Sequence, residues 1–326
     1  MKATARAPAN IAFIKYWGKA DDALRLPLNP SLSMNVSGAY TVTTVDFSPN
    51  YTKDNVSLLN GKFSDEEAAR VIRVLDQMRT KVGRNERVRV ATQNTFPKGI
   101  GSAASASGFA ALTVAGFAAL EVAPSERELT IFARQGSGSA CRSIPDGFVV
   151  WRRGYISEES YAYSLYPHTH WDIRDILVIV DSTMKKVSTT EGMNMVQTSP
   201  LLKHRLDVIP ARMKRTVDAL SKRNFQMLGE VIEEDCLDTH AVMRSQVPSL
   251  EYWNTETQSI IYAVRHWRGE GIPVYFTIDA GPNVHLICEG KDESKVLSAL
   301  KEVGGIESII VNKVSEGTRI IEDHLF

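Results

Sequence analysis

The chain has 326 residues, of which 43% are hydrophobic and 23% are charged, so it can bury one large core or two smaller ones. Its 38 lysines and arginines balance 38 aspartates and glutamates, and this zero net charge argues against a general binder of nucleic acid or other polyanions. The three cysteines are far apart and no stretch has the length and apolar character of a membrane span, so we expect a cytoplasmic protein.

The first stretch with possible chemistry is residues 10–22, which read "NIAFIKYWGKADD". It places the polar side chains of Asn10, Lys15, Tyr16 and Lys19 close together. Lys15 follows an apolar run, so its stem can be buried, and a buried ammonium group needs an anionic partner. An edge strand with ordinary lysines would explain the same pattern.

Residues 87–94, "RVRVATQN", alternate polar and apolar side chains and predict a half-buried strand. The next segment, "FPKGIGSAASASGFAAL", runs into a helix predicted over residues 108–121, which is apolar on nearly every side. The glycines let a ligand approach the backbone, the serines offer hydroxyl groups, and a helix N-terminus attracts phosphate. The sequence is not a Walker A loop. A phosphate site and a small-residue turn before a buried helix both fit.

A second small-residue stretch, "RQGSGSACRS", covers residues 134–143. Ser137, Ser139 and Arg142 together suit an anion rich in oxygen, because a guanidinium group binds carboxylate or phosphate through two parallel hydrogen bonds. A turn that caps a helix, with Arg142 in solvent, would also account for it.

The second half begins after a strand predicted at residues 175–181, and we place a domain boundary near Thr183. A hydroxyl-rich loop follows, and residues 199–245 have a helical period punctuated by Pro210 and Gly229, which predicts two or three helices. Residues 273–290 predict two strands around an Ala-Gly-Pro-Asn turn. Asp279 ends the first of them, where it could act as a general base or simply bind the turn backbone. The alternation of strands and helices favours an α+β or mixed α/β architecture.

In this order, the motifs "APANIAFIKYWGK", "LRLPLNPSLSMNV", "FPKGIGSAASASGFAAL", "GSGSACRS", "KKVSTTEGM" and "DAGPN" resemble those of the diphosphomevalonate decarboxylases. That family belongs to the superfamily of galactokinase, homoserine, mevalonate and phosphomevalonate kinases. The resemblance runs from Ala7 to about Asn283. It implies a two-domain α+β fold, with residues 1–183 like the second domain of ribosomal protein S5 and residues 184–326 ferredoxin-like. It also implies a homodimer.

The resemblance further implies a reaction of the mevalonate pathway of isoprenoid biosynthesis. ATP, with Mg²⁺ bridging its phosphates, phosphorylates the tertiary 3-hydroxyl of a 5-phosphorylated mevalonate. The 3-phosphate then leaves as CO2 is lost, and an isopentenyl product remains. The alternative is a kinase of the same superfamily that phosphorylates the hydroxyl group and stops there.

Residue by residue, the resemblance implies three catalytic side chains. Asp279 takes or orients the hydroxyl proton, Lys15 pairs with Asp279 and stabilises the moving charge, and Arg142 holds the substrate carboxylate. It implies that the substrate is contacted by Asn10, Tyr16, Lys19, Arg70, Ser137, Ser139 and Thr190. It places the ATP phosphates against Gly99, Gly101, Ser102 and Ser105, and it implies no metal-binding cluster of protein side chains.

Two departures from the family pattern bear on the substrate. Ala20 stands where an arginine often follows KYWGK, and Asp146 follows the "GSGSACRS" motif. One basic side chain fewer and one acidic side chain more near the presumed substrate site would disfavour a diphosphate by Coulomb energy. The sequence therefore leaves two substrates open, 5-phosphomevalonate and the family's usual 5-diphosphomevalonate.

Overall fold

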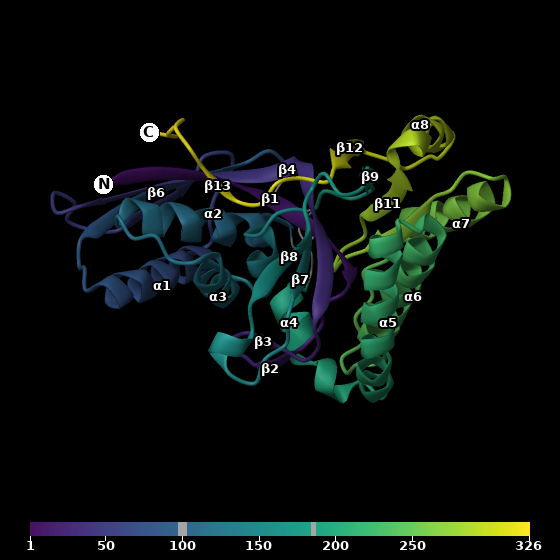
Figure 1. Cartoon of the computed structure of the whole chain (residues 1–326), viewed down its shortest axis with the longest axis horizontal. Helices are drawn as coiled ribbons and strands as arrows, with labels where there is room; N and C mark the ends of the chain where they lie inside the picture. The colour runs from purple at the N-terminus through teal and green to yellow at the C-terminus, as the bar shows by residue number, and fades with distance from the viewer. Residues whose placement is uncertain (97–102, 184–186) are drawn as a thin grey trace.

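The computed structural model describes residues 1–96, 103–183 and 187–326, which form two sheets side by side, each covered by helices (Figure 1). Among the described helices, none has the length and apolar character needed to cross a membrane.

The first sheet is built on two long neighbouring strands, β1 (Lys2–Ile14) and β4 (Ser31–Ser48). β13 (Arg319–Ile321) pairs with the outer edge of β1, and β6 (Arg87–Asn94) and then β5 (Asn55–Leu58) extend the sheet beyond β4. At the start of β4 the sheet continues through β7 (Phe148–Trp151) and β8 (Ala162–Tyr166). The alternating segment at residues 87–94 is therefore a strand, as its pattern predicts.

Three helices, α1 (Asp65–Val82), α2 (Ala103–Ala119) and α3 (Glu126–Gly136), cover one face of this sheet (Figure 1). Ser64 and Ser125 start α1 and α3 with capping boxes, in which each serine and a glutamate three residues later satisfy free N–H groups. α2 contacts β1 and β4 on one side and α1 and α3 on the other. That position between layers explains why its sequence is apolar all round.

The second sheet has the order β10 (Tyr275–Ile278), β11 (Val284–Glu289), β9 (Ile173–Ile179) and β12 (Ser308–Lys313), with every pair antiparallel. Helices connect β9 to β10, and α8 (Glu293–Leu300) connects β11 to β12. This β-α-β-β-α-β order is the ferredoxin-like arrangement that the motifs imply.

The helices between β9 and β10 are α4 (Thr189–Asn194), α5 (Leu202–Lys222), α6 (Phe225–Ser245) and α7 (Thr255–Gly269). The break between the two longest is at Arg223, which is left-handed, and not at Pro210 or Gly229, which lie inside α5 and α6. Gly229 lets α6 pack closely on β10, since a Cβ there would fall 2.0 Å from the ring of Tyr275.

Strand pairing suggests a different division of the chain from a single cut near Thr183. β9 precedes Thr183 but, among the described strands, pairs only with β11 and β12, and β13 returns to β1 at residues 319–321. We therefore propose that the first domain ends between β8 and β9 and that residues 319–321 also belong to it.

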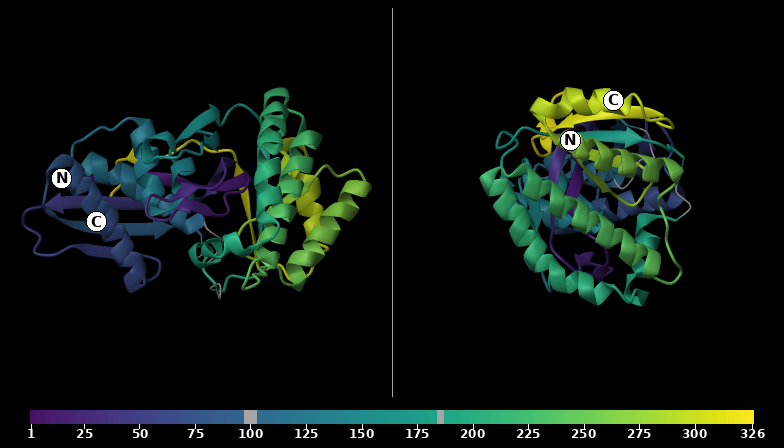
Figure 2. Two further views of the ribbon diagram at one scale, coloured as in Figure 1. Left: turned by 90° about the horizontal axis from the view of Figure 1, so that it is seen from below. Right: turned by 90° about the vertical axis from the view of Figure 1, so that its right-hand side faces the viewer.

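The two sheets share one hydrophobic core. Ile11 and Phe13 of β1 and Met34 of β4 belong to the same buried cluster as Val178 of β9 and Phe276 of β10. Figure 2 shows both chain termini at the end of the molecule remote from α7. Lys15 follows β1 directly and Asp279 follows β10 directly, so the shared core brings the ends of these two strands together.

Candidate active site

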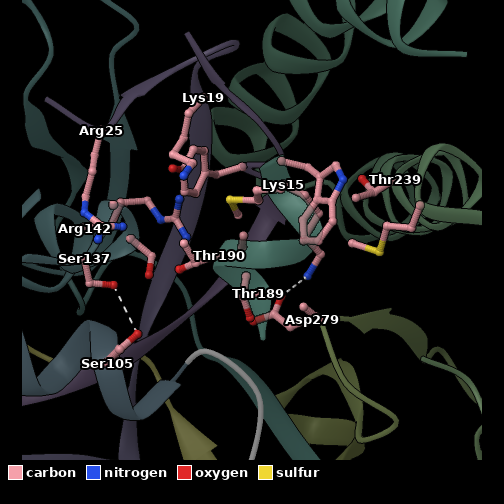
Figure 3. Close-up of a pocket in the computed structure, with 18 of the residues that line it drawn as sticks. Lys15, Lys19, Arg25, Ser105, Ser137, Arg142, Thr189, Thr190, Thr239 and Asp279 are labelled. Carbon is pink, nitrogen blue, oxygen red and sulfur yellow. Dashed lines mark hydrogen bonds and ion pairs between the residues drawn. The ribbon is translucent and has the colours of Figure 1, made fainter. Parts of the chain in front are cut away.

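A cleft of about 740 Å³, counted with the solvent space at its mouth, opens where β1 and β10 end (Figure 3). It collects every predicted site residue that the structure describes except Asn10. Its polar and charged lining side chains are Lys15, Tyr16, Lys19, Arg25, Arg70, Ser105, Ser137, Ser139, Arg142, Thr189, Thr190, Thr239 and Asp279.

Lys15 and Asp279 form an ion pair in this cleft, with 2.6 Å between Nζ and Oδ1. The Lys15 side chain is buried and that of Asp279 is 20% exposed. Burial by itself raises the pKa of Asp279, but the charge and hydrogen bond of Lys15, with the nearby His285 and Arg142, outweigh it and lower the pKa to about 2. Asp279 is therefore a carboxylate at neutral pH.

The backbone of Lys15 is held by a buried ionic cluster that the motifs do not reveal. Its N–H donates to Asp235 Oδ2 at 2.7 Å, and its carbonyl accepts from Arg205 Nη2 at 3.2 Å and from Asn29 Nδ2 at 3.0 Å. Arg205 pairs in turn with Asp235 and Asp238, and the side chains of Arg205 and Asp235 are fully buried. In the sequence, these residues indicate only a charged face on α5 and α6. Residue spacing alone cannot distinguish a buried charged face from one exposed to solvent.

Arg142 is 4% exposed, and no carboxylate of the described residues pairs with it. Its Nε and Nη2 donate to Asn10 Oδ1 at 3.2 and 3.1 Å, and its Nη1 donates to Ser31 Oγ at 2.6 Å. The Asn10 amide also donates to Ser143 Oγ and to the carbonyl of Ser139. Asn10 thus lies behind Arg142 and orients it, without lining the cleft.

Tyr16 lies against the segment that carries Arg142. Its ring meets that of Trp151 edge-on with 4.6 Å between centroids, and burial raises the pKa of its hydroxyl group. A Cβ at position 138 would lie 2.7 Å from Tyr16 Cε1 and 2.9 Å from its hydroxyl oxygen. Only glycine fits at position 138 beside this ring, which explains one glycine of the "GSGSACRS" motif.

Ser105 belongs to the first turn of α2, and its hydroxyl lies 3.1 Å from that of Ser137. The other predicted ATP contacts, Gly99, Gly101 and Ser102, lie outside the described residues. Next to Ser105 is a second pocket of about 590 Å³, counted with open solvent. It shares Ser105 and Arg70 with the cleft and is otherwise lined mainly by apolar side chains, among them Leu58, Phe63, Val71, Phe109 and Leu112.

The charges that line the cleft are strongly unbalanced although the chain as a whole is neutral. Asp279 is its one acidic lining residue in the described part of the chain, against the basic residues Lys15, Lys19, Arg25, Arg70 and Arg142. Lys19 is held by Asp22 and by Asn194 Oδ1 at 2.8 Å. The sequence comparison missed Arg25, because nothing in its spacing shows that the turn between β2 (Lys19–Asp21) and β3 (Leu26–Pro27) folds back over the cleft.

The argument from Ala20 and Asp146 for a less positive site was wrong. Ala20 is exposed, and Asp146 lies outside the cleft, where its carboxylate meets His168 Nδ1 at 2.9 Å. Arg25 brings a positive charge into the cleft that the motif comparison did not count. The charge balance therefore gives no reason to prefer a 5-monophosphate.

Comparisons with known proteins cover nearly the whole chain. Residues 7–162 match the diphosphomevalonate decarboxylase-like N-terminal domain, and residues 176–322 match the mevalonate 5-diphosphate decarboxylase C-terminal domain. The diphosphomevalonate decarboxylase of Gibberella zeae is 35% identical, over 94% of this chain and 87% of its own length. That of Homo sapiens is 32% identical, over 98% of this chain and 94% of its own length.

Solved structures agree with this. The mevalonate diphosphate decarboxylase from Staphylococcus aureus has a TM-score of 0.92 and 36% identity, with 98% of each chain covered. The enzyme from Enterococcus faecalis has a TM-score of 0.91 and 34% identity, with 99% of each chain covered. A structure of MDDEF in complex with MVAPP, AMPPCP and magnesium has a TM-score of 0.92 at 34% identity, with 99% of each chain covered. The family and the two-part α+β fold expected from the motifs are confirmed, and this chain belongs to the diphosphomevalonate decarboxylase family.

Proposed function

We propose that this protein is an ATP-dependent decarboxylase that converts 5-diphosphomevalonate to isopentenyl diphosphate. The observation that supports this best is Arg142, a buried cation with no carboxylate partner among the described residues, in the same cleft as the Lys15–Asp279 pair. Solved relatives bind MVAPP, AMPPCP and magnesium, and mevalonate diphosphate mediates ATP binding in the Enterococcus faecalis enzyme. The homodimer and the cytoplasmic location stay predictions.

Arg142 is suited to hold the substrate carboxylate. A buried guanidinium group without a counter-ion is costly, and a bound carboxylate would supply the missing negative charge through two hydrogen bonds. Asn10 and Ser31 fix the orientation of the guanidinium group from behind. The substrate therefore binds a side chain that is already ordered.

Asp279 and Lys15 are suited to the transfer of the phosphoryl group. The Asp279 carboxylate accepts a hydrogen bond from the 3-hydroxyl group and takes its proton as the new O–P bond forms, while the bond from the γ-phosphorus of ATP to its bridging oxygen breaks and ADP leaves. Lys15 stabilises the negative charge on the transferring group. In the second step the C3–O bond breaks and the 3-phosphate leaves. The C1–C2 electron pair becomes the C2–C3 double bond as CO2 departs from the carboxylate that Arg142 holds in place.

ATP fits the remaining part of the site. The first turn of α2, with Ser105, suits the phosphates, and the apolar pocket beside it suits a nucleotide base. Mg²⁺ neutralises charge on the phosphates when it is bound. The described residues contain no group of three or more His, Cys, Asp and Glu side chains that could hold a metal. We therefore expect phosphate oxygens and the Ser105 hydroxyl group to hold it, which fits the preference of Mg²⁺ for few protein ligands.

One set of incubations tests this function. The purified protein is given Mg-ATP with mevalonate, its 5-phosphate or its 5-diphosphate, and ADP and CO2 are measured separately. We expect ADP and CO2 in equal amounts from the 5-diphosphate. ADP without CO2 would indicate a kinase that stops at the 3-phosphate, and CO2 only from the 5-monophosphate would overturn the proposed substrate.

A further inference from the structure

Arg25 has an unusual backbone for an arginine. It lies in the turn between β2 and β3 with φ at 51°, in the left-handed region that residues other than glycine seldom adopt. Such conformations cost about 1–3 kcal/mol and gather at functional sites, where the surrounding structure enforces them.

Several contacts enforce this conformation. The N–H of Leu24 donates to Asp21 Oδ1 at 2.7 Å, and the carbonyl of Leu24 accepts from the Nε of buried Arg134 at 3.0 Å. Arg25 itself donates from Nε to the carbonyl of Gln135 at 3.0 Å. Within the described part of the chain this is its one hydrogen bond, so its terminal NH2 groups are left to meet a ligand. Figure 3 shows the side chain reaching into the cleft beside Arg142 and Ser137.

The charges around Arg25 point to an anion. Arg70 lines the same cleft, and its pKa is lowered first by burial and then by the positive charge of Arg25. Neither arginine forms an ion pair with a carboxylate of the described residues. The Nε of Arg70 is buried and has no hydrogen-bond partner among them either. Two neighbouring guanidinium groups that line one cleft repel each other, and a strongly charged anion between them could bind both.

Arg25 lies at the end of the cleft remote from the reacting atoms. Figure 3 shows the Arg25 and Asp279 side chains at opposite sides of the cleft, with Arg142 on the side of Arg25, and the charge of Arg25 acts on Tyr16 and Arg70. A mevalonate chain with its carboxylate at Arg142 and its 3-hydroxyl at Asp279 extends its 5-phosphate group toward Tyr16. The second phosphate of a diphosphate would reach one step further.

We propose that Arg25 binds the distal phosphate of the 5-diphosphate and is the residue through which this site prefers the diphosphate to the monophosphate. This proposal rests on the proposed function. Arg25 is a specificity residue, since it lies away from the bonds that form and break.

The test compares Arg25→Asn with the wild type on both substrates. Asparagine tolerates the left-handed conformation, so the variant should fold and keep its melting temperature. A hydrogen bond to a charged group is worth about 1.5–3 kcal/mol, so kcat/KM for the 5-diphosphate should fall about tenfold or more, mainly through KM. The value for the 5-monophosphate should change less than about threefold; if it is not turned over, its inhibition constant is compared instead.

Arg223→Asn is the matched control, because Arg223 has the same left-handed conformation, with φ at 50°, at the end of α5 and away from the cleft. This variant should leave kcat/KM unchanged for both substrates. Equal losses on both substrates in Arg25→Asn, or no loss on the diphosphate, would refute the role of Arg25 while the proposed function stands. A wild type that releases no CO2 from the diphosphate would refute the proposed function itself.

Discussion

Asp279 is ionised because of its neighbours and in spite of its partial burial. Lys15, His285 and Arg142 together outweigh the cost of desolvation, and the pKa falls to about 2. Such a carboxylate is a weak base in the resting site. It can take the proton only when the 3-hydroxyl group becomes more acidic as the O–P bond forms, which suits a late transfer of the proton.

Replacing Asp279 with asparagine tests this role at the level of one residue. The side chain keeps nearly the same shape but can no longer take a proton, so kcat should fall by about 10²–10⁴-fold. ATP binding, measured by calorimetry, should be almost unchanged, because the proposed phosphate contacts lie at α2. Near-normal turnover would refute the role.

The low pKa also predicts how the Lys15–Asp279 pair responds to pH. The pKa of Asp279 is lower in the folded state than the value of about 3.9 in an unfolded chain, so its contribution to stability is present above pH 4 and is lost as the pH falls toward 2. The difference in the free energy of unfolding between the wild type and Asp279→Asn should therefore be constant from pH 7 to pH 5. A transition in that difference between pH 5 and 7 would contradict the assignment.

Individual residues also show where the sequence was informative. Lys15, Arg142 and Asp279 each stand in a motif whose neighbours are fixed by packing, such as Gly138 against Tyr16, and the structure brings all three into one cleft. Arg25 could not be identified, because its place in the cleft depends on how a turn folds back. Asp146 was misjudged for the same reason, since a position next to a motif in the sequence does not give the direction of its side chain.

At the scale of elements, the 3-10 helix Gly138–Ser143 brings the ring of Tyr16 and the guanidinium group of Arg142 into one site. It follows α3 directly, and Ser137 both ends α3 and precedes the 3-10 helix. A glycine at position 138 is therefore required by the close approach of Tyr16, in addition to any contact of this segment with substrate.

Gly138→Ala should disturb the cleft without unfolding the protein. The added methyl group would lie 2.7 Å from Tyr16 Cε1, so the ring must move, and we expect kcat/KM for the phosphorylated substrate to fall about tenfold or more. Gly269→Ala is the matched control, since a Cβ there meets nothing within 4 Å. Steady-state kinetics and melting temperatures check both variants. Unchanged kinetics in Gly138→Ala would show that the contact has no role in the site.

Prediction from the sequence failed mainly where a strand pairs with strands that are far away along the chain. Residues 87–94 reveal themselves by alternation and residues 108–121 by a nearly unbroken apolar run, because each is a local pattern. The pairing of β9 with β11 and β12 depends on residues more than a hundred positions away, and no local pattern encodes it. This is why a boundary near Thr183 seemed reasonable from the sequence.

At the scale of the molecule, the buried cluster of Arg205, Asp235 and Asp238 joins α5 and α6 to the end of β1. It thereby fixes Lys15, which directly follows a strand of the first sheet, relative to the helices of the second. Because Asp279 follows a strand of the second sheet, the 2.6 Å contact between Lys15 and Asp279 depends on this junction.

Changing Asp235 to asparagine should have two separable effects. It leaves Arg205 with less compensating charge in a buried site, so we expect a loss of about 3–5 kcal/mol in the free energy of unfolding, measured with urea. The double variant Arg205→Met, Asp235→Leu should recover most of that stability, because an apolar pair removes both charges.

Catalysis should not recover in that double variant, because the backbone of Lys15 has lost its hydrogen bonds to both side chains. We expect kcat at least tenfold below the wild type in both variants, with smaller changes in KM. Recovery of kcat together with stability would mean that the cluster supports the fold alone.

The pairing of β13 with β1 has a consequence for the order in which the protein is made. Thr4 lies opposite Ile321, so the ribosome must make the chain as far as β13 before the outer edge of β1 finds its partner (Figure 1). Until then the nascent N-terminal domain carries an open strand edge, which is a site for pairing with other chains. Protection of that edge during translation, by a chaperone or by slow release, would therefore matter more for this protein than its neutral and ordinary composition suggests.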